Sequence, residues 1–232
     1  MTSVIGNLQG VHSRIGQACA AAGRPVDSVT LLAVSKTFPA SAVRDAFDAG
    51  CRQFGENYVQ EMLDKIATLA DLRSQITWHL IGPLQSNKTR PVAEAVDWVH
   101  SVDRLKIAER LSDQRPAHLP PLQVCLQVNI SGEASKSGLA PTEVPALAVA
   151  VAALPRLRLR GLMAIPEPAA DAAAQRVPHR ALSELLAALN AQGLALDTLS
   201  MGMSADLEAA VAEGATIVRV GTAIFGGRTY PA

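Results

Sequence analysis

An alternation of strand-like and helix-like segments, repeated eight times in 232 residues, constrains the fold of this chain more than any other feature. Short apolar runs of β-forming residues predict strands at 29–34, 52–55, 76–81, 97–100, 122–130, 157–163, 196–199 and 216–220. Apolar residues at helical spacing predict helices at 2–22, 40–49, 58–69, 87–96, 104–112, 141–154, 177–192 and 206–213.

This alternation predicts parallel strands joined by helical crossovers. Eight such units in a chain of this length predict the α/β class and a single (β/α)8 TIM barrel domain over residues 1–232, with an extra N-terminal helix. An open doubly wound sheet is the alternative, because the alternation counts the strands without showing that the sheet closes.

Local signals add three finer expectations. Asp103 is predicted to cap the helix at 104–112, and Ser204 the helix at 206–213. The alanine- and proline-bearing stretch 166–175 is predicted to be a mobile loop.

Charge and cysteine content exclude several classes of function. Lys plus Arg equals Asp plus Glu, at 21 each, so no global field recruits nucleic acid or acidic membranes. The three cysteines are far apart and form no Cys/His cluster, which argues against a disulfide framework and a metal site. The N-terminus does not show a basic region followed by an apolar core, and no apolar segment is long enough to span a membrane. A cytoplasmic location is therefore expected.

The first predicted strand ends in a lysine, Lys36, within the stretch Ser35-Lys36-Thr37. An amine delivered by a buried strand is one way to build a nucleophilic lysine. From this stretch alone, a solvated loop lysine is the simpler interpretation.

The other predicted strands also end in polar or small residues. In a closed barrel, all carboxyl ends of the strands meet on one face, where chemistry takes place. The residues at or just after these ends are Lys36, Glu56, Asn57, His79, Ser101, Asn129, Met163, Ser200, Met201, Gly202, Arg219, Gly221 and Thr222.

Two glycine-bearing turns follow the last two strands, at 199–204 and 219–224. Free amide groups at such strand-to-helix turns, with Ser and Thr hydroxyls beside them, form an anion cradle. Barrels often bind phosphate after strands seven and eight, so the two turns together favour phosphate over a purely conformational role for Gly202 and Gly221.

A lysine and a phosphate cradle on one barrel face suggest a ligand that carries both a carbonyl and a phosphate. Pyridoxal 5′-phosphate (PLP) fits, with its aldehyde as a Schiff base on Lys36. Arg219 would face the pyridine nitrogen and keep it unprotonated, because a guanidinium cannot accept a proton. An ion pair with a carboxylate is the alternative for Arg219.

Three further candidates each have two interpretations. His79 either stacks against the ring or fills the barrel interior. Asn57, next to Glu56, either orients the lysine or the ring hydroxyl, or caps the next helix. Lys136 could guard the site or bind phosphate, but a solvated loop lysine is favoured.

Several blocks, in order from about residue 4 to residue 226, resemble the pyridoxal phosphate homeostasis protein family. They are Val-Ser-Lys-Thr at 34–37, Phe-Gly-Glu-Asn at 54–57, Trp-His-Leu-Ile-Gly at 78–82, Leu-Gln-Ser-Asn-Lys at 84–88, Val-Asn-Ile-Ser-Gly-Glu at 128–133, Gly-Leu-Met at 161–163, Leu-Ser-Met-Gly-Met-Ser at 199–204 and Val-Arg-Val-Gly-Thr at 218–222. The stretch 166–178 departs from many relatives.

The resemblance implies a barrel similar to the N-terminal domain of alanine racemase, with PLP covalently bound at Lys36. It also implies phosphate held by Ser200 and by the backbones of Gly202, Gly221 and Thr222. The cofactor-binding residues expected are Lys36, Asn57, His79, Met163, Ser200, Met201, Gly202, Arg219, Gly221 and Thr222, without metal ligands.

Such proteins resemble racemases but lack the C-terminal β-domain that supplies a second catalytic residue, and this chain ends at Ala232. Racemisation needs acid–base groups on both faces of the substrate carbon, but Tyr58 begins a helix and Tyr230 lies in the tail. The expected function is therefore PLP homeostasis by a monomeric carrier, with PLP-dependent apoenzymes as possible recipients. A racemase-like enzyme is the alternative; a phosphosugar aldolase with Lys36 disagrees with the matched blocks.

Overall fold

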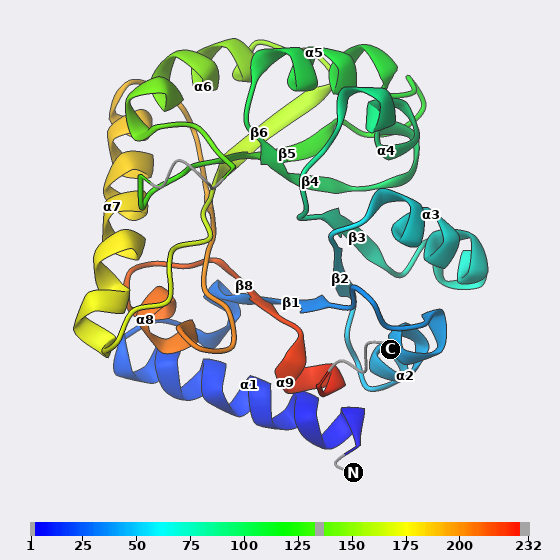
Figure 1. The fold of residues 1–232 in the computed structure, drawn as a ribbon, viewed down its shortest axis with the longest axis vertical. Coiled ribbons are helices and arrows are strands. Elements are labelled where there is room, and N and C mark those ends of the chain that lie inside the picture. The colour runs from blue at the N-terminus through cyan, green and yellow to red at the C-terminus, as the bar shows by residue number, and fades with distance from the viewer. Residues whose placement is uncertain (1–2, 133–136, 228–232) are drawn as a thin grey trace.

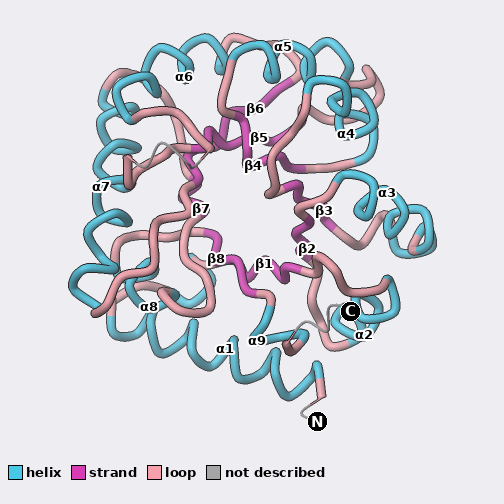
Figure 2. Tube along the Cα trace, in the orientation of Figure 1, coloured by secondary structure: helices cyan, strands magenta, loops and turns pink. Residues whose placement is uncertain are grey.

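The computed structural model describes residues 3–132 and 137–227, and its centre is a closed barrel of eight parallel strands in chain order (Figures 1 and 2). Each strand pairs with the next, and β8 pairs with β1 in four residue pairs, which closes the sheet. The predicted (β/α)8 barrel is confirmed, and the open sheet is wrong. The strands are β1 (Thr30–Val34), β2 (Gln53–Glu56), β3 (Thr77–Leu80), β4 (Trp98–Val102), β5 (Leu122–Gln127), β6 (Leu157–Met163), β7 (Thr198–Ser200) and β8 (Ile217–Val220).

Helices surround the barrel on its outside (Figure 2). The predicted N-terminal helix is present as α1, and it packs against α8 and α9. The helices are α1 (Val4–Ala21), α2 (Ala40–Asp48), α3 (Val59–Thr68), α4 (Thr89–Ala95), α5 (Leu105–Gln114), α6 (Val144–Ala152), α7 (Ala172–Ala191), α8 (Leu207–Ala212) and α9 (Thr222–Phe225), with short 3₁₀ helices at Val26–Ser28, Ala70–Leu72, Ser86–Lys88 and Pro141–Glu143.

The barrel wall separates two apolar regions. A large core lies between strands and helices, and it includes the tilted aromatic pair Phe54–Trp78 with ring centroids 6.0 Å apart. A small separate cluster consists of Leu32 and Val34, which are alternate residues of β1, together with Ile81 and Ile217. Because side chains alternate along a strand, this second cluster lies inside the barrel.

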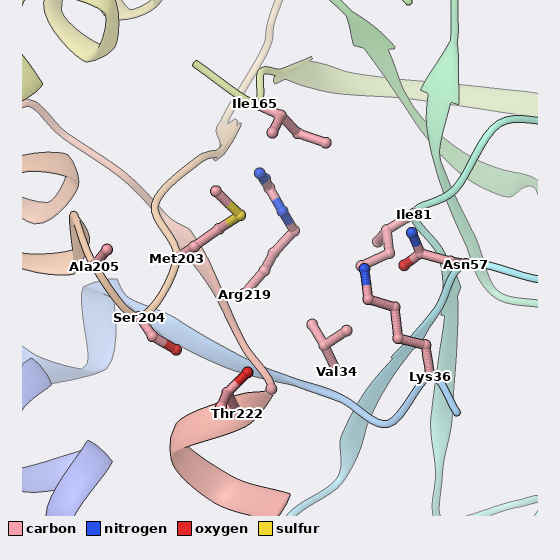
Figure 3. A pocket seen from close by; sticks show the side chains of 11 residues that line it. Val34, Lys36, Asn57, Ile81, Ile165, Met203, Ser204, Ala205, Arg219 and Thr222 are labelled. Atoms are coloured by element: carbon pink, nitrogen blue, oxygen red, sulfur yellow. The ribbon is translucent and has the colours of Figure 1, made fainter. Parts of the chain in front are cut away.

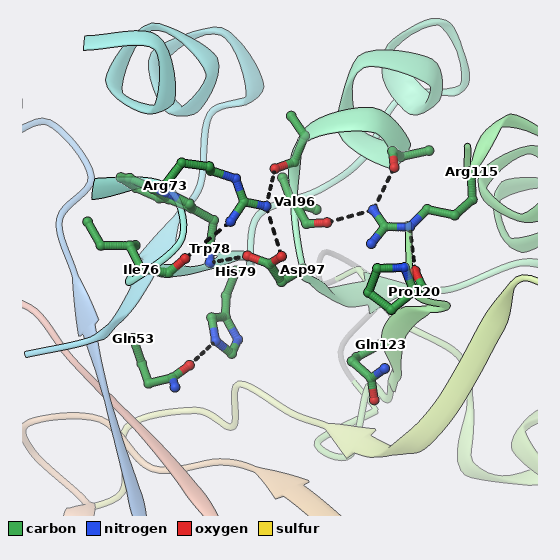
Figure 4. Close-up of polar contacts among 12 residues, drawn as sticks. Gln53, Arg73, Ile76, Trp78, His79, Val96, Asp97, Arg115, Pro120 and Gln123 are labelled. Carbon is green, nitrogen blue, oxygen red and sulfur yellow. Dashed lines mark hydrogen bonds and ion pairs between the residues drawn. The ribbon is translucent and has the colours of Figure 1, made fainter. Parts of the chain in front are cut away.

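At the end of the barrel opposite the carboxyl ends of the strands, arginine side chains form hydrogen bonds with the first residues of the strands and with the turns before them (Figure 4). Arg73 donates to the carbonyls of Ile76 and Ala95 and to Asp97, whose other oxygen accepts the N–H of Trp78 at 2.8 Å. These contacts satisfy backbone carbonyls that would otherwise be buried without partners.

The segment before β7 differs from the prediction. Helix α7 begins at Ala172 inside the expected loop, and it contains Pro178 in its interior. The Asp171 carboxylate caps this helix by accepting the N–H of Ala174 at 2.8 Å. A cap and an alanine-rich first turn outweigh the missing N–H of one proline.

Two predicted caps are wrong. Arg104 occupies the N-cap position of α5, and its backbone leaves Asp103 one residue outside the helix. Asp206 is the N-cap residue of α8, so Ser204 lies in the preceding turn. A polar residue near a helix start does not by itself identify the N-cap, because the N-cap position depends on where the first turn closes.

The longest predicted strand is also shorter than expected. β5 ends at Gln127, and in the described part of the segment that follows an isolated bridge between Val128 and Leu139 is all that continues it. Within residues 3–132 and 137–227, no helix combines the length and apolar character needed to cross a membrane. The same residues contain no group of three or more His, Cys, Asp or Glu side chains suited to a metal ion.

Candidate functional site

A cavity of about 260 Å³ lies at the carboxyl ends of the strands (Figure 3). Its wall comes from β1, β2, β3, β6, β7 and β8 or the turns that follow them, so residues at the carboxyl ends of six strands share this cavity. Of the predicted site residues, Lys36, Asn57, Arg219, Gly221 and Thr222 line it. The remaining wall residues are Val34, Ile81, Ile165, Met203, Ser204 and Ala205.

The backbone around Lys36 has an unusual conformation. Thr37 has φ of 70°, the only positive φ of a non-glycine residue in the described chain. This region is unfavourable for a β-branched side chain and has to be held by its surroundings. The N–H of Thr37 donates to Glu61 at 2.6 Å, and the N–H of Ser35 donates to the carbonyl of Gly55.

A second lysine, Lys65 on α3, lies behind Lys36 on the outer side of the barrel wall. Its ammonium donates to the carbonyl of Ser35 at 2.8 Å and to Glu56 and Glu61 at 2.6 Å each. The Ser35 hydroxyl also donates to Glu56. The backbone on both sides of Lys36 is thereby tied to one buried cluster of charges.

Two members of the cluster are deeply buried, with Lys65 4% exposed and Glu56 fully covered, whereas the Glu61 side chain is 27% exposed. Burial raises the pKa of Glu56, although the charge of Lys65 acts in the opposite direction, and the Oε2 atom of Glu56 has no hydrogen-bond partner among the described residues. Sequence analysis missed Lys65. Its only signal is the spacing of four residues from Glu61, which is typical of ordinary exposed helix pairs.

Arg219 faces the cavity from β8 and is only 4% exposed. Its Nη1 donates to the carbonyl and hydroxyl oxygens of Ser200, and its Nη2 donates to the carbonyl of Ala164 at 2.8 Å. Burial lowers the pKa of Arg219 to about 10, so the guanidinium stays charged near neutral pH. Its partners in the described chain are neutral oxygens, which excludes the alternative of an ion pair there.

The two glycine-bearing turns form the side of the cavity that carries hydroxyl groups. In Figure 3, the hydroxyls of Ser204 and Thr222 lie on the same side. Within residues 3–132 and 137–227, no hydrogen bond uses the amide N–H of Ser204, Ala205, Gly221 or Thr222. Four amides without partners, beside two hydroxyls, are the donor set that a phosphate group requires.

At both glycines, a side chain would collide with a neighbouring residue. Gly202 has φ of 89°, and a Cβ there would lie 2.5 Å from the Cβ of Ala210. A Cβ on Gly221 would lie 3.0 Å from the carbonyl oxygen of Val34, where β8 meets β1. These contacts give both glycines a conformational role, which is compatible with the donor set beside them.

Asp206 fixes the turn that carries the donors. One carboxylate oxygen accepts the N–H of Met203 at 2.7 Å, and the other contacts Nε2 of His179 at 2.9 Å. Burial alone would raise the pKa of Asp206, but the hydrogen bonds from His179 and Met203 outweigh it and lower the pKa.

Five predicted residues do not line the cavity. Met163, Met201 and Ser200 are fully buried, and the Ser200 hydroxyl contacts Arg219 and His100. His79 fills the barrel interior, which was one of its two interpretations. Gly202 accepts the N–H of Arg219 with its carbonyl. Lys136 and Tyr230 lie outside the described residues.

The fold and the cavity define a class of protein, a (β/α)8 barrel with a lysine and a buried arginine at the carboxyl ends of its strands. The sequence model of the family described as "Alanine racemase, N-terminal domain" matches residues 7–229. An alanine racemase from Corynebacterium glutamicum shares the fold, with a TM-score of 0.63 at 18% identity over 94% of this chain and 60% of its own.

Closer relatives narrow the class. A protein of Pseudomonas aeruginosa named pyridoxal phosphate homeostasis protein is 66% identical over 100% of this chain and 99% of its own. The structure of PipY from Synechococcus elongatus with PLP bound is 42% identical, with a TM-score of 0.80, over 91% of this chain and 100% of that chain. The chain belongs to the pyridoxal phosphate homeostasis protein family, as its sequence blocks predict.

Proposed function

We propose that this chain is a single-domain protein that binds PLP in the cavity at the strand ends and acts in PLP homeostasis. One observation supports this function best: Lys36 and the buried Arg219 line the same cavity, and the described partners of Arg219 are all neutral. A buried cation without a carboxylate is costly unless an anionic or electron-rich ligand compensates it.

The residues present fit this cofactor. When bound, PLP supplies an aldehyde carbon that condenses with a primary amine, and Lys36 provides that amine. The amides of Ser204, Ala205, Gly221 and Thr222 would hold the phosphate, together with the two hydroxyls. Asn57 and Ile81 lie beside the Lys36 side chain in Figure 3 and would hold the ring from that side.

Arg219 would face the pyridine nitrogen. A guanidinium donates hydrogen bonds and does not accept protons, so it favours the unprotonated ring nitrogen. An unprotonated nitrogen makes the ring a weaker electron sink, which suits a protein that holds the cofactor more than one that uses it for catalysis.

The lining of the cavity supports the carrier over the racemase. Its described residues include only two with basic or acidic side chains, Lys36 and Arg219. Tyr58 is largely exposed and does not line it. A racemase needs a second acid–base group on the other face of the substrate carbon. We extend the proposal to a monomer in the cytoplasm that passes PLP to PLP-dependent apoenzymes.

Borohydride reduction followed by peptide mass mapping tests this function. We expect a phosphopyridoxyl group on Lys36 in protein loaded with PLP, and its loss in Lys36→Ala. Lys88→Ala, which removes an exposed lysine, serves as the control and should retain the modification. A modification on another lysine, or on none, would refute the assignment.

A further inference from the structure

A line of polar side chains runs through the barrel interior, from the cavity toward the strand starts. Arg219 Nη1 lies 2.9 Å from the Ser200 hydroxyl, which lies 2.8 Å from Nδ1 of His100. Nε2 of His100 lies 2.9 Å from Nδ1 of His79, and Nε2 of His79 lies 2.7 Å from the side-chain oxygen of Gln53. Figure 4 shows the last of these contacts. The residues come from five strands, β8, β7, β4, β3 and β2.

The guanidinium sets the direction of every hydrogen bond in this line, because it can only donate. The Ser200 oxygen accepts from Arg219, so its own hydrogen goes to Nδ1 of His100. Nε2–H of His100 then donates to Nδ1 of His79, and Nε2–H of His79 donates to Gln53. With the opposite direction, the Ser200 hydrogen would have no acceptor among its contacts in the described chain.

In this direction of the hydrogen bonds, both histidines are neutral Nε2–H tautomers. A protonated His100 would present a hydrogen at Nδ1 to the Ser200 oxygen and displace the serine hydrogen into a site without an acceptor. Among the residues that the structure describes, no negatively charged group contacts His100: it is faced by His79 from β3, Ser200 from β7 and the cationic Arg219 from β8, with Trp98 on its own strand.

The environment also opposes protonation. Burial lowers the pKa of His79 to about 3, and burial together with His79 and Arg219 lowers the pKa of His100 well below its usual range. The ring of His79 is stacked on that of Trp98 with centroids 5.4 Å apart, so the Trp98 ring covers one face of His79.

We propose that His100 is a positioning residue, which holds the Ser200 hydroxyl so that the Arg219 guanidinium stays fixed against the cofactor without losing its charge to a carboxylate. The role toward the cofactor rests on the proposed function; the direction of the hydrogen bonds does not. A carboxylate in place of Ser200 and His100 would also fix the arginine, but it would neutralise the charge that faces the ligand. The neutral pair of Ser200 and His100 fixes the arginine and leaves its positive charge available to the ligand.

Substitutions at His100 distinguish positioning from packing. Glutamine can accept from Ser200 with its oxygen and donate to His79 with its amide, so we expect His100→Gln to hold PLP within about twofold of the wild type. His100→Leu keeps an apolar volume but offers no acceptor, so we expect the dissociation constant for PLP to rise about tenfold and the cofactor absorbance to shift. His118→Gln, at an exposed histidine, is the matched control and should change neither.

Heteronuclear NMR of the imidazole nitrogens in cofactor-free protein measures the tautomers directly. We expect unprotonated Nδ1 and protonated Nε2 in both buried histidines at neutral pH. An Nδ1–H tautomer or an imidazolium at His100 would overturn the proposal, as would unchanged PLP affinity and absorbance in His100→Leu. If His100→Leu does not fold, Ser200→Ala replaces it with the same expected loss of affinity, and unchanged affinity there also overturns the proposal. Failure of the wild type to bind PLP would instead refute the proposed function, while the tautomer result would still decide the direction of the line.

Discussion

At the scale of single residues, the position of Lys36 depends on a second lysine on the other side of the barrel wall. Lys65 binds the carbonyl just before Lys36, and it shares Glu61 with the N–H just after it. The strained φ of Thr37 is thereby held by contacts from α3. A lysine that must reach a fixed ligand atom benefits from a backbone that cannot relax.

Lys65→Met tests the structural part of this arrangement. Methionine retains the length of the side chain but leaves the buried Glu56 without its cation, so we expect the free energy of unfolding to fall by about 3 kcal/mol or more. Urea unfolding monitored by circular dichroism measures the loss. Adding Glu56→Gln to Lys65→Met should recover part of it, because the uncompensated charge is removed as well.

An exposed ion pair provides the matched control. Arg44 and Asp71 form a bidentate pair at 2.9 Å on the surface. Because solvent screens such pairs, Arg44→Met should leave the unfolding midpoint almost unchanged. Equal losses for Arg44→Met and Lys65→Met would contradict the importance of the buried cluster.

The conformation of Gly202 leads to a second prediction at the scale of single residues. Gly202→Ala adds a Cβ 2.5 Å from Ala210 at a φ of 89°, so we expect a loss of about 2 kcal/mol or more in stability. Gly10→Ala, in an exposed part of α1 where a Cβ meets nothing within 4 Å, should instead stabilise by about 0.5–1 kcal/mol. Thermal unfolding of both variants checks the opposite signs; a stabilised Gly202→Ala would contradict the packing argument.

The sequence located the site by strand ends, and depth along the strand explains part of what reaches the cavity. Arg219 is an exception, because it lies within β8 and still lines the cavity, and Met201 and Gly202 lie beyond β7 without lining it. Lys36, Asn57 and Thr222 lie one or two residues beyond their strands and reach the cavity. His79 and Ser200 lie within their strands and point to the barrel interior, one layer deeper. Strand limits are uncertain by a residue or two in sequence analysis, which is enough to move a side chain from cavity to interior.

At the scale of elements, apolar periodicity predicted the helices because each one buries a stripe against the barrel. It predicted the start of α2 at Ala40 but not that of α7, because a helix start depends on individual hydrogen bonds. The alanine- and proline-bearing stretch 166–175 suggested a loop followed by a helix from residue 177, but the side chain of Asp171 starts α7 at Ala172.

Asp171→Ala tests that cap. Loss of the bond to the N–H of Ala174 should cost about 1 kcal/mol and speed amide exchange in the first turn of α7. Hydrogen exchange followed by mass spectrometry locates the effect. Glu184→Ala, at an exposed position in the same helix, is the control and should leave that turn unchanged; equal exchange in both variants would show that Asp171 does not start the helix.

At the scale of the whole molecule, closure of the barrel creates the interior in which the site is built. The alternation of elements predicted eight parallel strands, but only the pairing of β8 with β1 brings Arg219 beside Leu32 and opposite Ser200 of β7. Closure also buries two histidines from β3 and β4 that are far from Arg219 in sequence. These long-range neighbours have no local signature, so sequence analysis left His79 with two interpretations and did not select His100.

The two buried histidines predict how stability depends on pH. In the unfolded chain a histidine binds a proton below its ordinary pKa of 6.5, whereas burial lowers the pKa of His79 to about 3 and that of His100 well below 6.5 in the folded state. The unfolded state thus binds more protons as the pH falls below 6.5, and each histidine should cost about 1.4 kcal/mol of stability per pH unit. Urea unfolding between about pH 7 and pH 5 measures this slope.

The double variant His79→Gln/His100→Gln should lose most of the slope, because neither position can then bind a proton, while His118→Gln should lose little of it. The raised pKa of Glu56 contributes with the opposite sign at the acid end of this window, but it is common to all three proteins and cancels in the comparison. A double variant with the wild-type slope would show that these histidines are not held neutral by the barrel.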